Sequence, residues 1–212
     1  MPLEVINQNE NKISIRLKGI PIQYANALRR ICLNGVPIFA IDTIEVLENT
    51  SIMPDEAIAH RLGLIPLKTD STDITISEEE TDESSSRVEL TLDSEENDAE
   101  DKSGTRTVFS NELKGKDSVV RPISDKIPIV TLAPGQKIKF QAYARLGRGT
   151  EHAKWNSANT SVLTETKDKD EHILTVESTG SLDAKNIVLI GMDELSTRLV
   201  KFKEMLSDLK TK

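Results

Sequence analysis

The sequence is short of the residues from which most enzyme and cofactor sites are built. It contains a single cysteine, Cys32, which excludes an internal disulfide, a four-cysteine zinc site and a cysteine-ligated iron–sulfur cluster within the chain. Aromatic residues make up only 3% of the chain, whereas proteins that bind single-stranded nucleic acid usually interleave aromatic and basic residues. We therefore expect any role on nucleic acid to be indirect.

The chain also lacks the hydrophobic segments that direct proteins to membranes. No apolar run approaches the roughly 20 residues of a membrane span, and residues 1–12 have neither the basic nor the apolar region of a signal peptide. With 212 residues, of which 37% are apolar, the chain is long enough for one large or two small globular domains. We expect an intracellular protein of the cytoplasm without a membrane partner.

Motifs for stand-alone catalysis are missing as well. The three histidines, His60, His152 and His172, are far apart and form no H-E-x-x-H pattern. Residues 147–149 offer two glycines without the third of a dinucleotide fingerprint, and there is no Walker A motif. We therefore assign no catalytic, cofactor-binding or metal-binding residue, and a stand-alone enzyme is disfavoured.

The negative charge of the chain is concentrated in one segment. Residues 77–101 contain twelve Asp and Glu and one Arg, a net charge of −11, which leaves +3 for the rest of a chain of net charge −8. Because blocks of like charge repel and stay extended, a solvated loop is the first interpretation. A partner-binding acidic arm and a metal-binding patch are the alternatives. Within this segment, residues 87–92 alternate polar and apolar as a strand does.

Hydrophobic periodicity predicts a mixed α and β protein. Helices are predicted at residues 24–34 and 57–62. Strands are predicted at residues 12–17, 38–47, 88–92, 106–109, 127–132, 137–143 and 172–177. Residues 156–170 form a polar stretch, and residues 87–145 are typical of a mostly antiparallel β unit. In the helix at residues 24–34, Cys32 lies on the apolar side, which favours a small core residue over a nucleophile.

The last part of the chain has the most regular hydrophobic spacing. Seven apolar residues, separated alternately by four and three positions, predict a long amphipathic helix. They are Val188, Met192, Leu195, Leu199, Phe202, Leu206 and Leu209. Gly191 lies within this helix at a cost of about 1 kcal/mol relative to alanine, which indicates a bend or a close contact. These seven side chains form an apolar stripe along the helix. Because burying each of them contributes about 1.5–3 kcal/mol, we expect the stripe to pack either on the protein's own sheet or on another chain.

Three long motifs, at the start, middle and end of the chain, carry a resemblance to a known family. The first is YANALRRI at residues 24–31 with DEAIAHRLGLIPL at residues 55–67, the second is LGRGTEHAKW at residues 146–155, and the third is VESTGSL at residues 176–182. Together they resemble the archaeal alpha-like, or D-type, subunits of DNA-directed RNA polymerase. This family is the counterpart of the N-terminal region of the bacterial alpha subunit and of the third-largest eukaryotic subunit.

The resemblance implies an α+β, two-domain fold of the RNA polymerase alpha-like type. In that family both ends of the chain form one discontinuous dimerisation domain, and a β-rich insert domain lies between them. For this sequence the resemblance implies a dimerisation domain of residues 1–48 and 166–212, which ends in the long amphipathic helix. The insert domain is then expected at residues 49–165.

The resemblance also implies a function. Members of the family are non-catalytic scaffold subunits of a DNA-dependent RNA polymerase, which is a nucleotidyltransferase complex that carries out transcription. They heterodimerise with the small subunit L, and the pair docks the large catalytic subunits during assembly. The implied partners are subunit L, the large catalytic subunits and other small polymerase subunits, with DNA reached only through the complex.

Two helices are expected to bind these partners. Arg29 and Arg30 are adjacent cations able to form bidentate contacts with carboxylates, and the resemblance implies that they dock a large subunit. A solvated helix edge is the alternative. Pairing with subunit L is assigned to the terminal helix, at Leu195, Leu199, Phe202 and Leu206, together with the helix that begins at Tyr24.

The loop of the second motif is a further expected subunit contact. Its glycines, Gly147 and Gly149, allow close approach of the backbone. Arg148, His152 and Lys154 are expected as polar contacts, and Trp155 as an apolar anchor for a partner. The alternative is a loop that connects strands and places Trp155 in the local core.

The chain departs from the family at the place where many archaeal members hold a cofactor. Those members carry a cysteine-rich domain with an iron–sulfur cluster between the tryptophan motif and the strand of the third motif. Here residues 156–171 fill that interval and contain no cysteine, so we expect no cofactor. A different class of function remains open: an independent adaptor or regulatory protein that binds partners through the acidic segment and the heptad helix.

Overall fold

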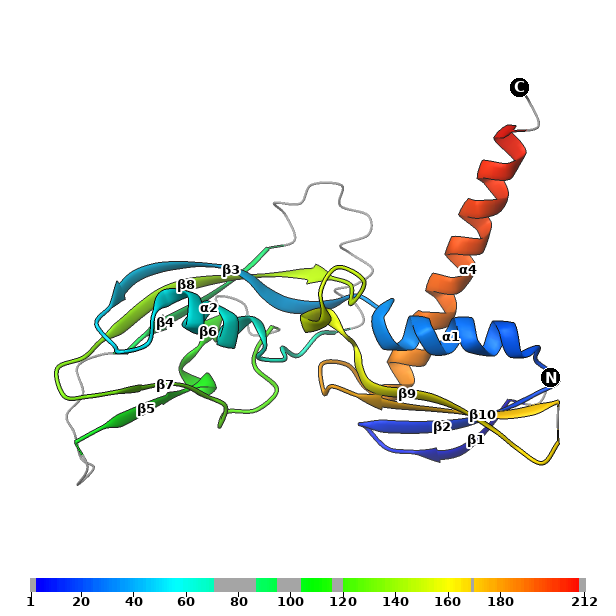
Figure 1. Cartoon of the computed structure of the whole chain (residues 1–212), viewed down its shortest axis with the longest axis horizontal. Coiled ribbons are helices and arrows are strands. Elements are labelled where there is room, and N and C mark those ends of the chain that lie inside the picture. Colours follow the sequence, from blue (N-terminus) through cyan, green and yellow to red (C-terminus); the bar gives the residue numbers. More distant parts are fainter. Residues whose placement is uncertain (1–2, 71–86, 95–103, 116–119, 169, 210–212) are drawn as a thin grey trace. The chain divides into compact units, whose positions relative to one another are not determined.

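The structure, a computed structural model, describes residues 3–70, 87–94, 104–115, 120–168 and 170–209 (Figure 1). Over these ranges the chain forms three α-helices and ten strands, and the paired strands are antiparallel. None of the helices described combines the length and the hydropathy needed to cross a membrane. The chain divides into two compact units, unit 1 from residues 1–37 and 148–212 and unit 2 from residues 38–147. The predicted α+β architecture is confirmed.

Unit 1 is built on a four-stranded antiparallel sheet. Its strands are β1 (Leu3–Gln8), β2 (Lys12–Lys18), β10 (Glu171–Ser178) and β9 (Ala158–Glu165), hydrogen-bonded in the order β1-β2-β10-β9. Ile13, Ile15 and Leu17 are buried on one face of β2, as their alternation predicts. Leu174 pairs with Ile15 and is buried on the same face.

Two helices cover this buried face. The helix α1 (Ile22–Asn34) packs on β9 and β10, and the first half of α4 (Ala184–Leu209) packs on β10 and β2 and crosses α1. The crossing is close at Gly191, where a Cβ atom would lie 3.2 Å from the Sγ atom of Cys32. The close contact predicted at Gly191 is therefore confirmed. Cys32 is buried in the core of unit 1, and this burial raises the pKa of its thiol to about 12.

A segment 113 to 125 residues later in the sequence caps the C-terminal end of α1. The last carbonyl groups of a helix have no partner within the helix. Here the Oγ of Ser157 donates to the carbonyl oxygen of Cys32 at 3.0 Å, and the N–H of Thr150 donates to that of Asn34 at 3.2 Å. Such capping joins residues 148–157 to unit 1.

In its described residues, unit 2 contains two antiparallel sheets and one α-helix. The first sheet consists of β3 (Ile38–Asn49), β8 (Ile138–Gly147), β4 (Val88–Asp93) and β6 (Lys114–Gly115), and the second of β5 (Arg106–Phe109) and β7 (Pro128–Leu132). The helix α2 (Asp55–Gly63) buries Ile58 and Leu62 in a core shared with both sheets. Arg61 ties this helix to β7 by donating to the carbonyl oxygen of Ile129 at 2.9 Å.

The two units divide the chain at positions different from those of the expected domains. The insert was expected at residues 49–165, whereas unit 2 spans residues 38–147. Residues 38–48 belong to unit 2 because β3 pairs with β8 along its whole length, from Ile38 to Asn49. Residues 148–165 belong to unit 1 because they cap α1 and form β9.

We predict that Gly149→Ala destabilises unit 1. A Cβ atom at this position would lie 2.0 Å from the Oδ1 of Asn156 and 2.9 Å from the Cα of Asn34. Since the second clash is with backbone, the cap of α1 must move, and overpacking of this kind costs about 1–3 kcal/mol. Urea unfolding of the two proteins measures the difference. Equal midpoints would show that the loop is not held against α1.

Candidate functional site

The hydrophobic stripe of α4 changes from buried to exposed along the helix. Val188 is 3% exposed and Leu195 is half-buried, in the half of the helix that packs on the rest of unit 1. Leu199, Phe202 and Leu206 are 51%, 59% and 44% exposed. Figure 1 shows this second half of α4, coloured orange to red, projecting away from α1 and the sheet of unit 1. Within the described residues the stripe therefore continues beyond the surface that covers it.

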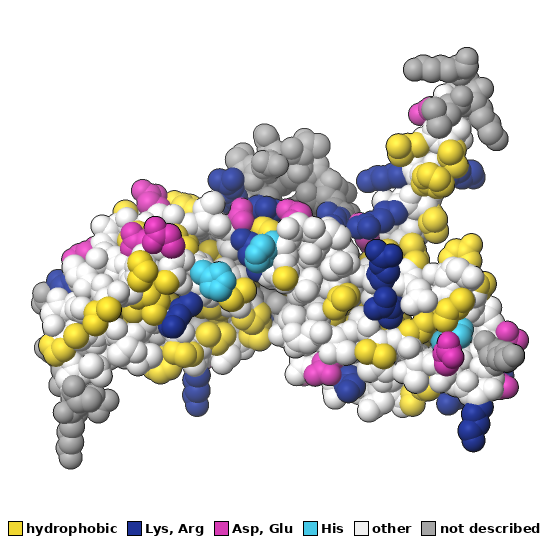
Figure 2. All heavy atoms as spheres, in the orientation of Figure 1, with side chains coloured by type: hydrophobic (Ala, Val, Ile, Leu, Met, Phe, Trp, Pro, Cys, Tyr) yellow, Lys and Arg dark blue, Asp and Glu magenta, His cyan; other side chains and the backbone are white. Residues whose placement is uncertain are grey.

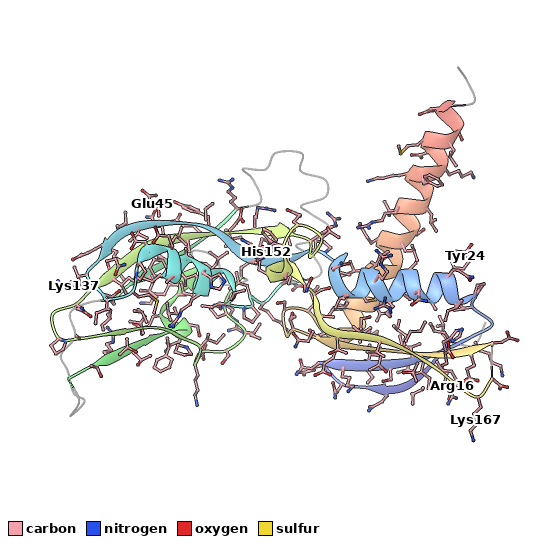
Figure 3. All side chains as sticks on the ribbon, viewed as in Figure 1. Arg16, Tyr24, Glu45, Lys137, His152 and Lys167 are labelled. Carbon is pink, nitrogen blue, oxygen red and sulfur yellow. The ribbon has the colours of Figure 1, made fainter. Side chains whose placement is uncertain are left out.

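Four more large apolar residues are exposed on α1 and α4. Leu189, Val200 and Met205 are exposed on α4, and Tyr24 is exposed on α1, where Figure 3 labels it. Sequence reasoning did not select the three residues on α4, because alternate spacing by four and three picks out a single line along a helix. Figure 2 shows hydrophobic side chains beside Lys and Arg side chains on the projecting part of α4.

This surface is suited to binding another polypeptide. Each large apolar side chain contributes about 1.5–3 kcal/mol when it is fully buried, so several of them together supply the main driving force of an association. Apolar surface bordered by charged groups is typical of a protein interface, where the centre excludes water and the rim stays polar. Arg198, Lys201 and Lys203 are exposed on the same half of α4 and supply such a rim.

The two arginines of α1 have different environments. Arg29 is half-buried, and its guanidinium donates to the carbonyl oxygen of Ser161 at 3.4 Å and to the Oδ1 of Asn26 at 3.3 Å. The Oγ of Ser161 in turn donates to the carbonyl oxygen of Arg29 at 2.8 Å. Arg30 is exposed, and among the described residues its side chain has no hydrogen bond or ion pair. The two were expected to act together, but Arg29 holds α1 to β9 and Arg30 alone is available to a partner.

Arg148 is directed into its own unit. Its Nε donates to the carbonyl oxygen of Gly35 at 3.2 Å, and its NH2 group lies 3.3 Å from the Oε2 of Glu194 on α4. The other carboxylate oxygen of Glu194 accepts from Arg198 at 2.8 Å. Arg148 was expected as a polar contact for a partner, whereas here it fixes the loop to α4 near the point where the stripe becomes exposed.

Trp155 is not available as an anchor for a partner. It lies in the short 3-10 helix η2 (Ala153–Trp155) and is only 3% exposed. The Nζ of Lys154 lies 4.2 Å above the centre of its ring, and the ring of His152 meets it edge-on at 6.5 Å. The alternative expectation, Trp155 in the local core, describes this geometry. His152, labelled in Figure 3, is exposed, and Lys154 is half-buried.

The acidic segment 77–101 lies mostly outside the described residues. Its described part, residues 87–94, contains β4, where a strand was predicted. Over the ranges that the structure describes, no group of three or more His, Cys, Asp or Glu side chains could hold a metal ion.

Comparison with known proteins gives the family of the chain. The family model described as the RNA polymerase Rpb3/RpoA insert domain matches residues 40–179. The chain belongs to this family. The match covers nearly all of unit 2 and continues through η2, β9 and β10 of unit 1.

Individual relatives of this Rpb3/RpoA family are archaeal polymerase subunits. The DNA-directed RNA polymerase subunit Rpo3 of Pyrococcus horikoshii is 42% identical over 158 residues, which are 74% of this chain and 57% of the relative. The Rpo3 subunit of Pyrococcus furiosus is 43% identical over 153 residues, 72% of this chain and 55% of the relative. That of Aeropyrum pernix is 38% identical over 169 residues, 76% of this chain and 58% of the relative. The chain thus spans little more than half the length of these relatives, and its resemblance to the archaeal alpha-like type is confirmed.

We predict that the purified chain contains no stoichiometric iron, sulfide or zinc. The single thiol, on Cys32, is buried, and one cysteine cannot provide the ligand set of a cluster. Elemental analysis and visible absorption spectroscopy measure the content. A reproducible metal content near one atom per chain contradicts the prediction.

Proposed function

We propose that the chain is a non-catalytic scaffold subunit of a DNA-dependent RNA polymerase. In this role it heterodimerises with the small subunit L, and the pair docks the large catalytic subunits before transcription. The chain has no active site of its own and reaches DNA only through the complex. Its relatives, which are polymerase Rpo3 subunits, support this role.

The observation that carries the proposal is the exposed half of α4. A helix that buries one half of its stripe within its own unit and exposes the other half offers an interface next to its own core. Burial of Leu199, Phe202 and Leu206 by a second subunit would continue the packing that begins at Val188. The proposed pairing therefore requires no rearrangement of unit 1.

Docking of a large subunit is assigned to α1 through Arg30. This side chain is exposed on a helix that three kinds of contact hold in place: the cap at its C-terminal end, the reciprocal bonds of Arg29 with Ser161, and the crossing with α4. Because the helix that carries Arg30 is already fixed, binding of its guanidinium to a carboxylate orders the side chain alone and not the backbone. The adaptor alternative rests on the acidic segment, most of which lies outside the described residues, so no observation favours it.

Replacing Leu199 and Phe202 with Asp tests the pairing. Co-expression of the wild-type chain with subunit L should give a soluble one-to-one heterodimer, and L199D/F202D should abolish it by placing two unpaired charges in the interface. Because both side chains are more than half exposed, circular dichroism should show that the variant is folded. Size-exclusion chromatography measures the pairing.

A matched control introduces a charge on the same helix outside the stripe. Thr197 is an exposed polar residue on the side of α4 opposite the stripe, so T197D should pair with subunit L as the wild type does. A wild-type chain that is monomeric, soluble and indifferent to subunit L would falsify the proposed scaffold role. A folded L199D/F202D that still pairs places the interface elsewhere.

Charge reversal at Arg30 tests the docking surface. We expect Arg30→Glu to weaken assembly with the large subunits, since a carboxylate contact becomes a repulsion. The heterodimer with subunit L should persist, and stability should change by no more than about 0.5 kcal/mol because the side chain is exposed. Arg29→Glu serves as the contrast and should lower stability itself, because it removes the bond to Ser161. Equal recovery of complete polymerase from the Arg30→Glu chain and the wild type counts against docking through α1.

A further inference from the structure

A short loop in unit 2 holds an exposed isoleucine in a fixed position. The loop joins β3 to α2 and is closed by side-chain hydrogen bonds across its base. The Nδ2 of Asn49 donates to the carbonyl oxygen of Met53 at 2.9 Å and to the Oδ1 of Asp55 at 2.6 Å. The N–H and Oγ of Ser51 donate to the Oδ1 of Asn49 at 3.0 and 2.7 Å. Between these residues Ile52 is 88% exposed.

The same loop is tied to a neighbouring strand and to the core. The N–H of Thr50 donates to the carbonyl oxygen of Lys137 at 3.0 Å, and its Oγ1 accepts from the N–H of Lys137 at 2.7 Å. Figure 3 labels Lys137 at the end of unit 2 where this connection lies. The side chain of Met53 packs against the core of unit 2. The loop is thus fastened on both sides of Ile52, and Ile52 points outward where Met53 points inward.

The fixed position distinguishes Ile52 from an ordinary exposed apolar residue. Single apolar side chains are common on protein surfaces and carry no meaning by themselves. A contact residue on a mobile loop loses conformational entropy when it binds, whereas this loop is already ordered by its own hydrogen bonds. An ordered loop whose branched apolar tip is almost fully exposed has the form of a knob that enters a socket.

The charges around this knob indicate the chemistry of its partner. Residues 48–56 contain three carboxylates and no Lys or Arg: Glu48, Asp55 and Glu56. On the paired strand Lys137 and Lys139 add positive charge, but Lys139 is bonded to Asp93 at 2.5 Å. Glu45, labelled on β3 in Figure 3, is also exposed. Figure 2 shows acidic side chains over the part of unit 2 that contains β3 and α2. The local charge is therefore negative.

We propose that the loop of residues 48–56, with Ile52 at its tip, docks another protein subunit of the polymerase through an apolar socket edged by Lys or Arg. This inference rests on the proposed function and adds a second docking surface, in unit 2. The acidic surroundings of Ile52 disfavour nucleic acid, whose phosphates are negative. They also disfavour a second copy of this chain, since two identical acidic loops would repel each other.

Cysteine labelling of Ile52→Cys tests the proposal. Cys32 is fully buried and burial raises its pKa to about 12, so the wild-type chain gives no background with a thiol-reactive maleimide. In the free chain the new thiol should react at the rate of an exposed cysteine. In the assembled polymerase that contains the same chain, labelling should be at least about ten times slower, since a ten-fold change corresponds to about 1.4 kcal/mol of protection.

A pair of substitutions provides an independent readout. Ile52→Asp should lower recovery of the chain in the polymerase several-fold, whereas Ile52→Val should not, because it keeps an apolar tip. Both variants should fold as the wild type does, since the side chain is exposed. The chain can enter the polymerase while its Ile52→Cys thiol is labelled as fast there as in the free chain. That result contradicts docking through Ile52 and leaves the scaffold role intact. If the chain does not enter the polymerase at all, both proposals fail.

Discussion

The capping of α1 by residues 148–157 is the interaction on which the rest of unit 1 depends. A helix that ends inside a structure must satisfy its last carbonyl groups, because buried polar groups without a partner cost free energy. Here the donors belong to Ser157 and Thr150, which follow unit 2 in the sequence, whereas α1 precedes it. Without this cap, α1 would be held by its apolar side and by the bonds between Arg29 and Ser161, and its C-terminal end, which follows Arg30, would lose its fixed position. Gly149 is the residue that lets the two backbones meet.

The division of α4 into two halves links the fold to the proposed function. Its first half completes the core of unit 1 over β10 and β2, with Gly191 allowing close packing on α1. Its second half repeats the same hydrophobic spacing, but nothing among the described residues covers it. One continuous helix thereby serves both the interior and a surface for a partner. The ion-pair network of Arg148, Glu194 and Arg198 lies where the two halves meet.

Most of the helices and strands could be predicted from the sequence, and strict periodicity was the clearest signal. β2 and α4 repeat apolar residues every second position or every three to four positions, and both were predicted. β1 and β9 were missed because they are the edges of the sheet: β1 is exposed along its whole length, and the side chains of β9 are mostly polar. The antiparallel β unit was predicted, but its boundaries required knowledge of the long pairing between β3 and β8.

The candidate site shows the same limit at the level of single residues. The sequence indicated Arg29 and Arg30 as a pair, yet only the position of Ser161 on β9 reveals that Arg29 is held within the unit. Tryptophan is a residue type expected of an interface anchor, yet Trp155 is buried because contacts within its own unit cover it. The stripe of α4 was visible in the sequence, but where it leaves the core was not. That point depends on where α1 and the sheet end in space.

Purification of the tagged chain from its native cells, followed by native mass spectrometry of the intact complex, tests the scaffold role most directly. The account predicts that the chain is recovered at one copy per complex, in fixed ratio with both large catalytic subunits and the small subunit L. Recovery of the chain alone, or in a stable complex that lacks the large subunits, would contradict it.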